Sequence, residues 1–133
     1  MNPDGLRMSL LASAAAPGLV RTLVEQRLMR WELLHRADDA LLVTGELVTN
    51  AVNAAPGREL WVRFTREAKG LLLEVWDPSD RIPESRSVEL DLDDGEFDAI
   101  GGWGLHIVQA LSLECGYARG PDGGKTVWAL LKP

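Results

Sequence analysis

The sequence predicts an α+β fold, a two-layer α/β sandwich in which helices cover one face of a mixed, mostly antiparallel sheet. Two observations lead to this prediction. Apolar residues recur at helical spacing in the first part of the chain, and the spacing changes to two from Glu59 onward. The expected order is strand, helix, helix, strand, strand, long loop, helix and strand, and helices that pack on one face of a sheet form two layers.

The first element is a short strand over 6–12, which we expect at an edge of the sheet. A helix follows, because Pro17 suits a first helical turn and apolar residues then repeat at helical spacing to about His35. His35 lies near the end of this helix, where the helix dipole favours a cation, and we prefer that explanation to a catalytic role.

A second helix is predicted over 38–56, after a very short connection. Its apolar residues keep helical spacing throughout. Asp38 or Asp39 can cap its start, and Pro56 with the glycine after it ends the helix.

Glu46, Asn50 and Asn53 form a polar stripe on this otherwise apolar helix. They stand at positions i, i+4 and i+7, and therefore fall within roughly 60° of arc. A buried carboxylate needs a partner. The stripe is therefore either a ligand-facing group or the solvated side of an amphipathic helix.

Two runs with a period of two, over 59–65 and 71–77, predict a β-hairpin with a turn at 67–70. In the second run, the alternation places Asp77 on the same side as the apolar residues. A carboxylate on that side needs a hydrogen-bond donor. It can accept from a ligand, or it can form a local Asx-turn with Pro78 and Ser79, which the spacing alone favours.

A long polar segment over 78–100 contains two prolines and several acids, without a sustained period. Loops of this length in a compact domain are usually functional lids or disordered. The segment runs into glycines at 101, 102 and 104, and a helix follows from Leu105. Glycines at a helix start let backbone N–H groups approach an anion, although such a cluster is also typical of a hinge.

The last part of the chain has a turn-rich connection after Cys115 and Gly116, and a final strand over 125–131 with β-branched and aromatic residues. Neither the dinucleotide spacing G-x-G-x-x-G nor a P-loop occurs. No internal repeat or linker divides the chain, so we expect a single domain over 1–133.

Length and composition indicate one soluble domain in a reducing cytoplasm. The chain has 133 residues, enough for a single core, and its one cysteine excludes an internal disulfide. No apolar run is long enough to cross a membrane, and the N-terminus lacks a signal-peptide pattern. The net charge of −6 and the dispersed basic residues argue against nucleic-acid binding. Two histidines and one cysteine do not supply a structural zinc site.

Several motifs follow one another along the chain: E-L-V-T-N-A on a helix, an aspartate at a strand end, a lid, G-G-W-G-L at a helix start, and G-K-T-V-W in the last strand. In this order the chain resembles the Bergerat-fold ATP-binding domain shared by gyrase, MutL and histidine kinases. It looks most like the single-domain serine/threonine-kinase anti-sigma factors and their actinobacterial relatives. The resemblance covers nearly the whole chain, and it implies an ATP lid at about 78–102.

The resemblance also implies a role for each matching position. Asn50 would hold the Mg²⁺ ion that bridges the ATP phosphates, and Glu46 would act as general base or orient the nucleophile. Asp77 would accept a hydrogen bond from the adenine amino group, and Thr126 would help to hold adenine. The further nucleotide-binding positions are Asn53, Gly102, Gly104 and Leu105.

Three functions are consistent with this resemblance. The first is a serine/threonine kinase that phosphorylates an anti-sigma-factor antagonist and also sequesters a sigma factor. The second is a nucleotide-dependent protein-binding module without kinase activity, and the third is an interaction protein that binds no nucleotide. The segment D-P-S-D over 77–80 lacks the glycines that the family often carries there, which motivates the second function, and we rank the three in the order given. The resemblance is also compatible with a homodimer, and we expect no direct contact with nucleic acid or membrane.

Overall fold

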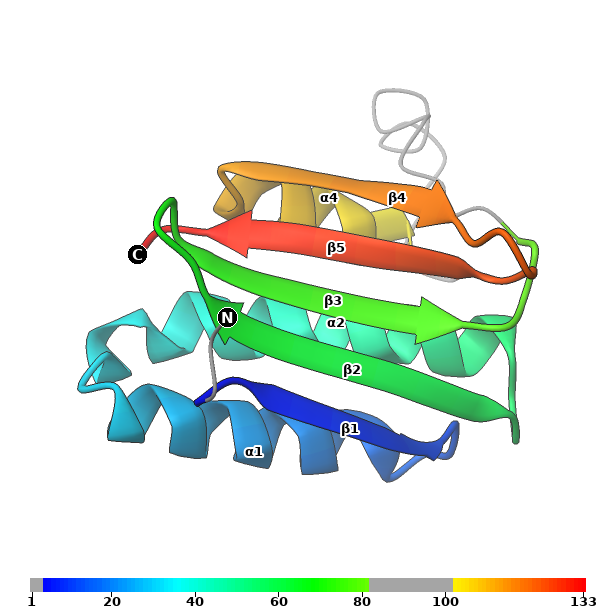
Figure 1. The fold of residues 1–133 in the computed structure, drawn as a ribbon, viewed down its shortest axis with the longest axis horizontal. Coiled ribbons are helices and arrows are strands. Elements are labelled where there is room, and N and C mark those ends of the chain that lie inside the picture. The colour runs from blue at the N-terminus through cyan, green and yellow to red at the C-terminus, as the bar shows by residue number, and fades with distance from the viewer. Residues whose placement is uncertain (1–3, 82–101) are drawn as a thin grey trace.

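The computed structural model describes residues 4–81 and 102–133, which form a sheet and a layer of helices on one of its faces (Figure 1). This arrangement confirms the predicted two-layer α+β fold. The elements in chain order are β1 (Leu6–Leu11), α1 (Ala16–Arg30), the short 3₁₀ helix η1 (Leu34–Arg36), α2 (Ala37–Ala54), β2 (Glu59–Arg66), β3 (Leu71–Asp77), α4 (Gly102–Leu111), β4 (Glu114–Arg119) and β5 (Lys125–Leu131).

Within the described residues the sheet has five strands in the order β1-β2-β3-β5-β4, and every neighbouring pair is antiparallel. The described sheet is therefore fully antiparallel, whereas the sequence had predicted a mixed, mostly antiparallel sheet. The reason is the place of β5. The chain crosses from β3 through α4 to β4, which runs parallel to β3, but β5 lies between these two strands and is antiparallel to both. The position of β1 at an edge is confirmed.

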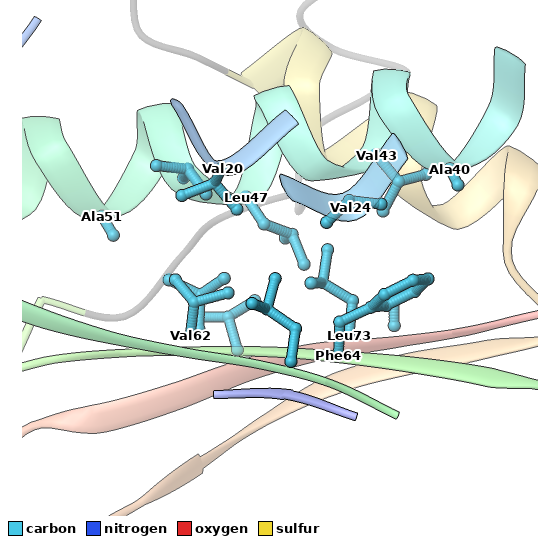
Figure 2. Close-up of a cluster of buried hydrophobic side chains, with 14 of the residues drawn as sticks. Val20, Val24, Ala40, Val43, Leu47, Ala51, Val62, Phe64 and Leu73 are labelled. Atoms are coloured by element: carbon cyan, nitrogen blue, oxygen red, sulfur yellow. The ribbon is translucent and has the colours of Figure 1, made fainter. Parts of the chain in front are cut away.

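The core lies between the sheet and the two long helices. In β3 the residues alternate between buried and half-buried, as expected for a strand with one face against helices. Figure 2 shows side chains of α1 and α2 pointing toward the sheet, where side chains of β2 and β3 meet them. The labelled members of this cluster that are fully buried include Val20, Val24, Val43, Leu47, Phe64 and Leu73.

The first helix ends earlier than the sequence pattern predicts. Helix α1 stops at Arg30 instead of continuing to about His35. Glu32 has a φ of 60°, which a continuing α-helix does not allow, and the Leu33 N–H donates to the Leu28 carbonyl instead. His35 lies in the separate helix η1, so it is not at the C-terminus of α1.

The second helix confirms the predicted segment but begins differently. Helix α2 starts at Ala37, and its N-cap is Arg36, whose side chain makes no capping hydrogen bond. Asp38 and Asp39 lie in the first turn and are not the cap. There they still favour the helix, because negative charge near a helix N-terminus interacts favourably with its dipole.

Strand β4 was not predicted, because E-C-G-Y-A-R has few of the residues that favour strands. Gly116 explains part of this composition. It pairs with Trp128 of β5, and a Cβ at Gly116 would lie 3.2 Å from the Trp128 ring. A side chain at this position would crowd the neighbouring indole, which favours glycine here.

None of the helices in residues 4–81 and 102–133 combines the length and apolarity that a membrane span requires.

Shortening Leu47 should test the packing of α2 on the sheet. The Leu47 side chain is 1% exposed, so Leu47→Ala should lower the free energy of unfolding by about 2–5 kcal/mol through lost burial and a residual cavity. Leu42→Ala is the matched control, because Leu42 lies on the same helix and is 44% exposed. It should change stability by about 0.5 kcal/mol or less. Urea denaturation followed by circular dichroism measures both, and equal losses would contradict this packing.

Candidate functional site

A buried ion pair joins the ends of β3 and β5. The Lys125 ammonium donates to both carboxylate oxygens of Asp77, at 3.0 Å to Oδ1 and 2.9 Å to Oδ2. Asp77 is 1% exposed and Lys125 is 3% exposed. The two residues are direct partners in the β3–β5 register, so both side chains point to the helix side of the sheet. The inward orientation predicted for Asp77 is confirmed.

Asp77 also forms the local turn that was the alternative interpretation of its sequence context. The Ser79 N–H donates to Asp77 Oδ1 at 2.8 Å, and the Arg81 N–H donates to Ser79 Oγ at 3.0 Å. The carboxylate therefore accepts from Lys125 and from the backbone at once. Because an ionised carboxylate has about four acceptor positions and an ammonium three N–H groups, roughly one acceptor and one donor remain on this pair.

Lys125 was missed by the sequence analysis, although a signal was present. It alternates with Val127 and Ala129, the inward-facing residues of β5. A lysine on the apolar side of a strand is as unusual as an aspartate there, and the two are best explained together.

The Thr126 side chain faces away from that of Asp77, on the opposite side of the sheet, contrary to the role expected for it. Its neighbour in β3 is Trp76, and both residues belong to the face of the sheet opposite the helices, where they line a surface pocket. The physical reason is the alternation of side chains along β5, which turns Lys125 inward and Thr126 outward. Thr126 therefore cannot line a site between the sheet and α2.

The polar stripe on α2 is partly buried. Glu46 and Asn50 are half-buried, whereas Asn53 is exposed. The Asn50 Nδ2 atom is buried and has no hydrogen-bond partner among residues 4–81 and 102–133. An unsatisfied buried amide typically costs about 1–3 kcal/mol, so a ligand group could stabilise this side chain by providing the partner that residues 4–81 and 102–133 do not supply.

The predicted elements of the site lie toward one end of the sheet. Figure 1 shows the C-terminal half of α2, the C-terminal end of β3 and the start of β5 at the same end of the molecule. Gly102 is the first residue of α4 and Gly104 lies in its first turn, as expected for glycines at a helix start. Leu105 is half-buried. Most of the lid expected over 78–102 falls outside the described residues.

A magnesium–nucleotide complex fits the groups that are present. The described residues contain no cluster of His, Cys, Asp or Glu that could by itself hold a metal ion. Mg²⁺ often keeps several waters and binds through substrate phosphates with only one or two protein oxygens. Because the oxygen and nitrogen of an amide are assigned from their surroundings, the unsatisfied end of Asn50 can equally present its oxygen to a cation.

Comparison with protein families agrees with this geometry. A model of the histidine kinase-like ATPase domain matches residues 11–130, from the last residue of β1 into β5. A search of curated proteins found no match.

Removing the Lys125 charge should test the ion pair. Lys125→Met leaves the Asp77 carboxylate buried without a cation, and should cost about 3–5 kcal/mol of unfolding free energy. Adding Asp77→Leu should recover most of this loss, because well-packed apolar residues often replace a buried pair at little cost. Lys132→Met, at an exposed position, is the control. Urea denaturation at neutral pH measures all three. If Lys125→Met alone is as stable as the Lys132→Met control, the pair is not formed.

Proposed function

Because the chain belongs to the histidine kinase-like ATPase family, we propose that it binds Mg-ATP and regulates a partner protein by transferring the γ-phosphoryl group to a serine or threonine. The proposed kinase is of the anti-sigma-factor type, and its proposed partners are an anti-sigma-factor antagonist and a sigma factor. Such a regulator would act in the cytoplasm, and a homodimer is compatible with it.

The observation that carries this proposal is the unsatisfied amide of Asn50. Its Nδ2 atom is buried without a partner among residues 4–81 and 102–133, and Asn50 lies one turn from Glu46 on the same helix. In this proposal the Asn50 oxygen holds the magnesium ion, which neutralises phosphate charge when it is bound. A ligand at this position would provide the partner that Asn50 lacks.

At the other end of the site, the Asp77–Lys125 pair would bind the base. The 6-amino group of adenine is a donor, and the adjacent ring nitrogen is an acceptor. The acceptor remaining on Asp77 and the donor remaining on Lys125 complement these two groups. Because the pair is almost fully buried, base binding requires local opening around these strand ends, which lowers the net affinity.

Glu46 would serve the chemical step. In the proposed transfer, the hydroxyl oxygen of the partner forms a bond to the γ-phosphorus, the bond to the β-phosphate oxygen breaks, and ADP leaves. The proton of the hydroxyl passes to the Glu46 carboxylate. Glu46 is half-buried and lies one turn before Asn50 on α2.

A protein-binding module without kinase activity is the second candidate function. The observation that favours it is the ion pair itself, because Lys125 already neutralises the carboxylate that would read adenine. With this carboxylate already paired, the fold would keep its stability without a nucleotide. The segment after Asp77 also lacks the glycines that the family often carries there.

Calorimetric titration with Mg-ATP should test the nucleotide site. We expect the wild-type chain to bind, and Asn50→Ala to weaken binding at least tenfold, because the metal-bridging oxygen is lost. Thr49→Ala is the matched control, since Thr49 lies next to Asn50 on the same helix but is exposed; the affinity of this variant should change less than threefold. At ATP concentrations about 100 times Kd, the wild-type protein should also gain about 2.7 kcal/mol of stability. A wild-type chain that does not bind Mg-ATP would refute the proposal.

Phosphoryl transfer should depend on Glu46. A partner captured with the tagged wild-type chain should acquire phosphoserine or phosphothreonine on addition of Mg-ATP, as measured by mass spectrometry. Glu46→Gln should lower the rate by roughly 10²–10⁴, because it removes the proton acceptor, while ATP binding stays within a few-fold of wild type. If ATP binds but the wild-type chain phosphorylates no partner, the module without kinase activity is the better description.

A further inference from the structure

The face of the sheet opposite the helices carries several tryptophans. Helices α1, α2 and α4 lie behind the sheet in the view of Figure 1, and no described helix covers the face toward the viewer. Trp61, Trp76 and Trp128 all alternate with buried residues of their strands and so belong to this open face. Trp61 is 55% exposed. Large apolar groups gathered on a solvent-facing surface commonly mark a binding site.

Two of these indoles rest on glycines, which fixes their position. A Cβ at Gly124 would lie 2.7 Å from Cζ2 of Trp76, and a Cβ at Gly116 would lie 3.2 Å from the Trp128 ring. Any side chain at these glycines would displace the rings. Trp61 is the direct neighbour of Trp76 in the β2–β3 register. The open face therefore presents the exposed Trp61 indole beside the Trp76 indole, which packs against Gly124.

A pocket of about 390 Å³ lies on this face. Trp61 and Trp76 form its apolar part, and Arg7, Arg63 and Glu74 form its charged part. Ligand pockets span about 300–1,000 Å³, so this one is small and suits a single large side chain better than an extended ligand.

One cation of the pocket, Arg7, has no partner among residues 4–81 and 102–133. Arg7 and Arg63 are directly opposite each other in the β1–β2 register, and like charges so placed repel. Arg63 donates to Glu74 at 2.6 Å, and this hydrogen bond raises the pKa of Arg63. Arg7 makes no hydrogen bond or ion pair within the described part of the chain. The two arginines and one glutamate leave a net positive charge here, although the chain as a whole carries −6.

We propose that this pocket docks a segment of a partner protein that presents an aromatic or large aliphatic side chain next to a carboxylate. The apolar side chain packs against Trp61 and Trp76, and the carboxylate pairs with the planar guanidinium of Arg7. Charge complementarity selects this occupant. The pocket is positive while the chain as a whole carries −6, so an acidic segment is attracted here and repelled elsewhere on the surface. Tryptophan and arginine are also the residues in which interface binding energy concentrates.

This proposal does not depend on nucleotide binding. The pocket and the Asp77–Lys125 pair lie on opposite faces of the sheet, because their residues alternate along β3 and β5. A partner on the open face leaves the helix side free. The two surfaces can therefore be tested separately.

The test uses the full chain labelled with ¹⁵N and two synthetic peptides, Ac-GDFDG-amide and its neutral analogue Ac-GNFNG-amide. The acidic peptide should shift the indole N–H resonances of Trp61 and Trp76 and leave that of Trp31, which is buried in the core, unchanged. The neutral analogue should bind roughly tenfold more weakly, since it lacks the charge-assisted hydrogen bond to Arg7.

Variants separate the two parts of the pocket. Arg7→Gln should bring the two peptides to equal affinity, whereas Trp61→Ala should weaken both peptides by roughly tenfold or more. Arg30→Gln, at an exposed position of α1 on the other layer, is the control and should preserve the preference for the acidic peptide. Because Arg7 and Trp61 are exposed, both variants should retain the Trp31 resonance of the folded chain.

Three results would overturn the proposal. The first is the absence of any shift at Trp61 or Trp76 with millimolar acidic peptide. The second is an unchanged preference for the acidic peptide in Arg7→Gln. The third is a concentration-dependent dimer, seen by sedimentation and abolished by Trp61→Ala, which would mean that a second copy of the chain covers this face.

Discussion

The constraint on which this structure depends is the alternation of side chains across its sheet. Every second residue of β2, β3 and β5 packs under α1 and α2, and the residues between them face away. The same rule that builds the core sends Asp77 and Lys125 to the helix side and Trp76 and Thr126 to the open side. Two chemically different surfaces therefore arise from adjacent positions of the same strands, separated only by the thickness of one sheet.

The sequence predicted those parts of the fold in which local pattern and tertiary packing agree. Helix α2 and the β2–β3 hairpin have strong periodicity, and they appear close to the expected residues. Strand β4 and the end of α1 could not be read in this way. Strand β4 exists because β5 pairs with it and the Trp128 indole covers its glycine, and both are contacts distant in sequence. The antiparallel pairing of the whole sheet depends on the same insertion of β5 between β3 and β4.

The candidate site was only partly accessible from sequence for a related reason. The alternation correctly placed Asp77 inward, and the stripe on α2 contains Asn50, whose Nδ2 atom is buried without a partner among the described residues. Applied to β5, the same alternation places Lys125 on the helix side and Thr126 on the open side. It would therefore have predicted Lys125, and not Thr126, as the neighbour of the Asp77 side chain. The Asp77–Lys125 pair and the unsatisfied Asn50 amide share one energetic property. Neither is the most stable arrangement for a protein that only has to fold, since a buried ion pair rarely improves on apolar packing and an unpaired amide costs free energy.

Gly124 is a position where the backbone of β3 and an indole of the open face leave little room for a side chain. It precedes Lys125, its φ is 74°, and a Cβ there would lie 2.5 Å from the Asp77 carbonyl oxygen and 2.7 Å from the Trp76 ring. Backbone conformation and lack of space each exclude a side chain at this position. A residue without any functional group is thus restricted by the backbone of Asp77 and by the Trp76 indole at once. A mutational scan would rank position 124 among the least tolerant in the chain, and the cause would lie in its neighbours.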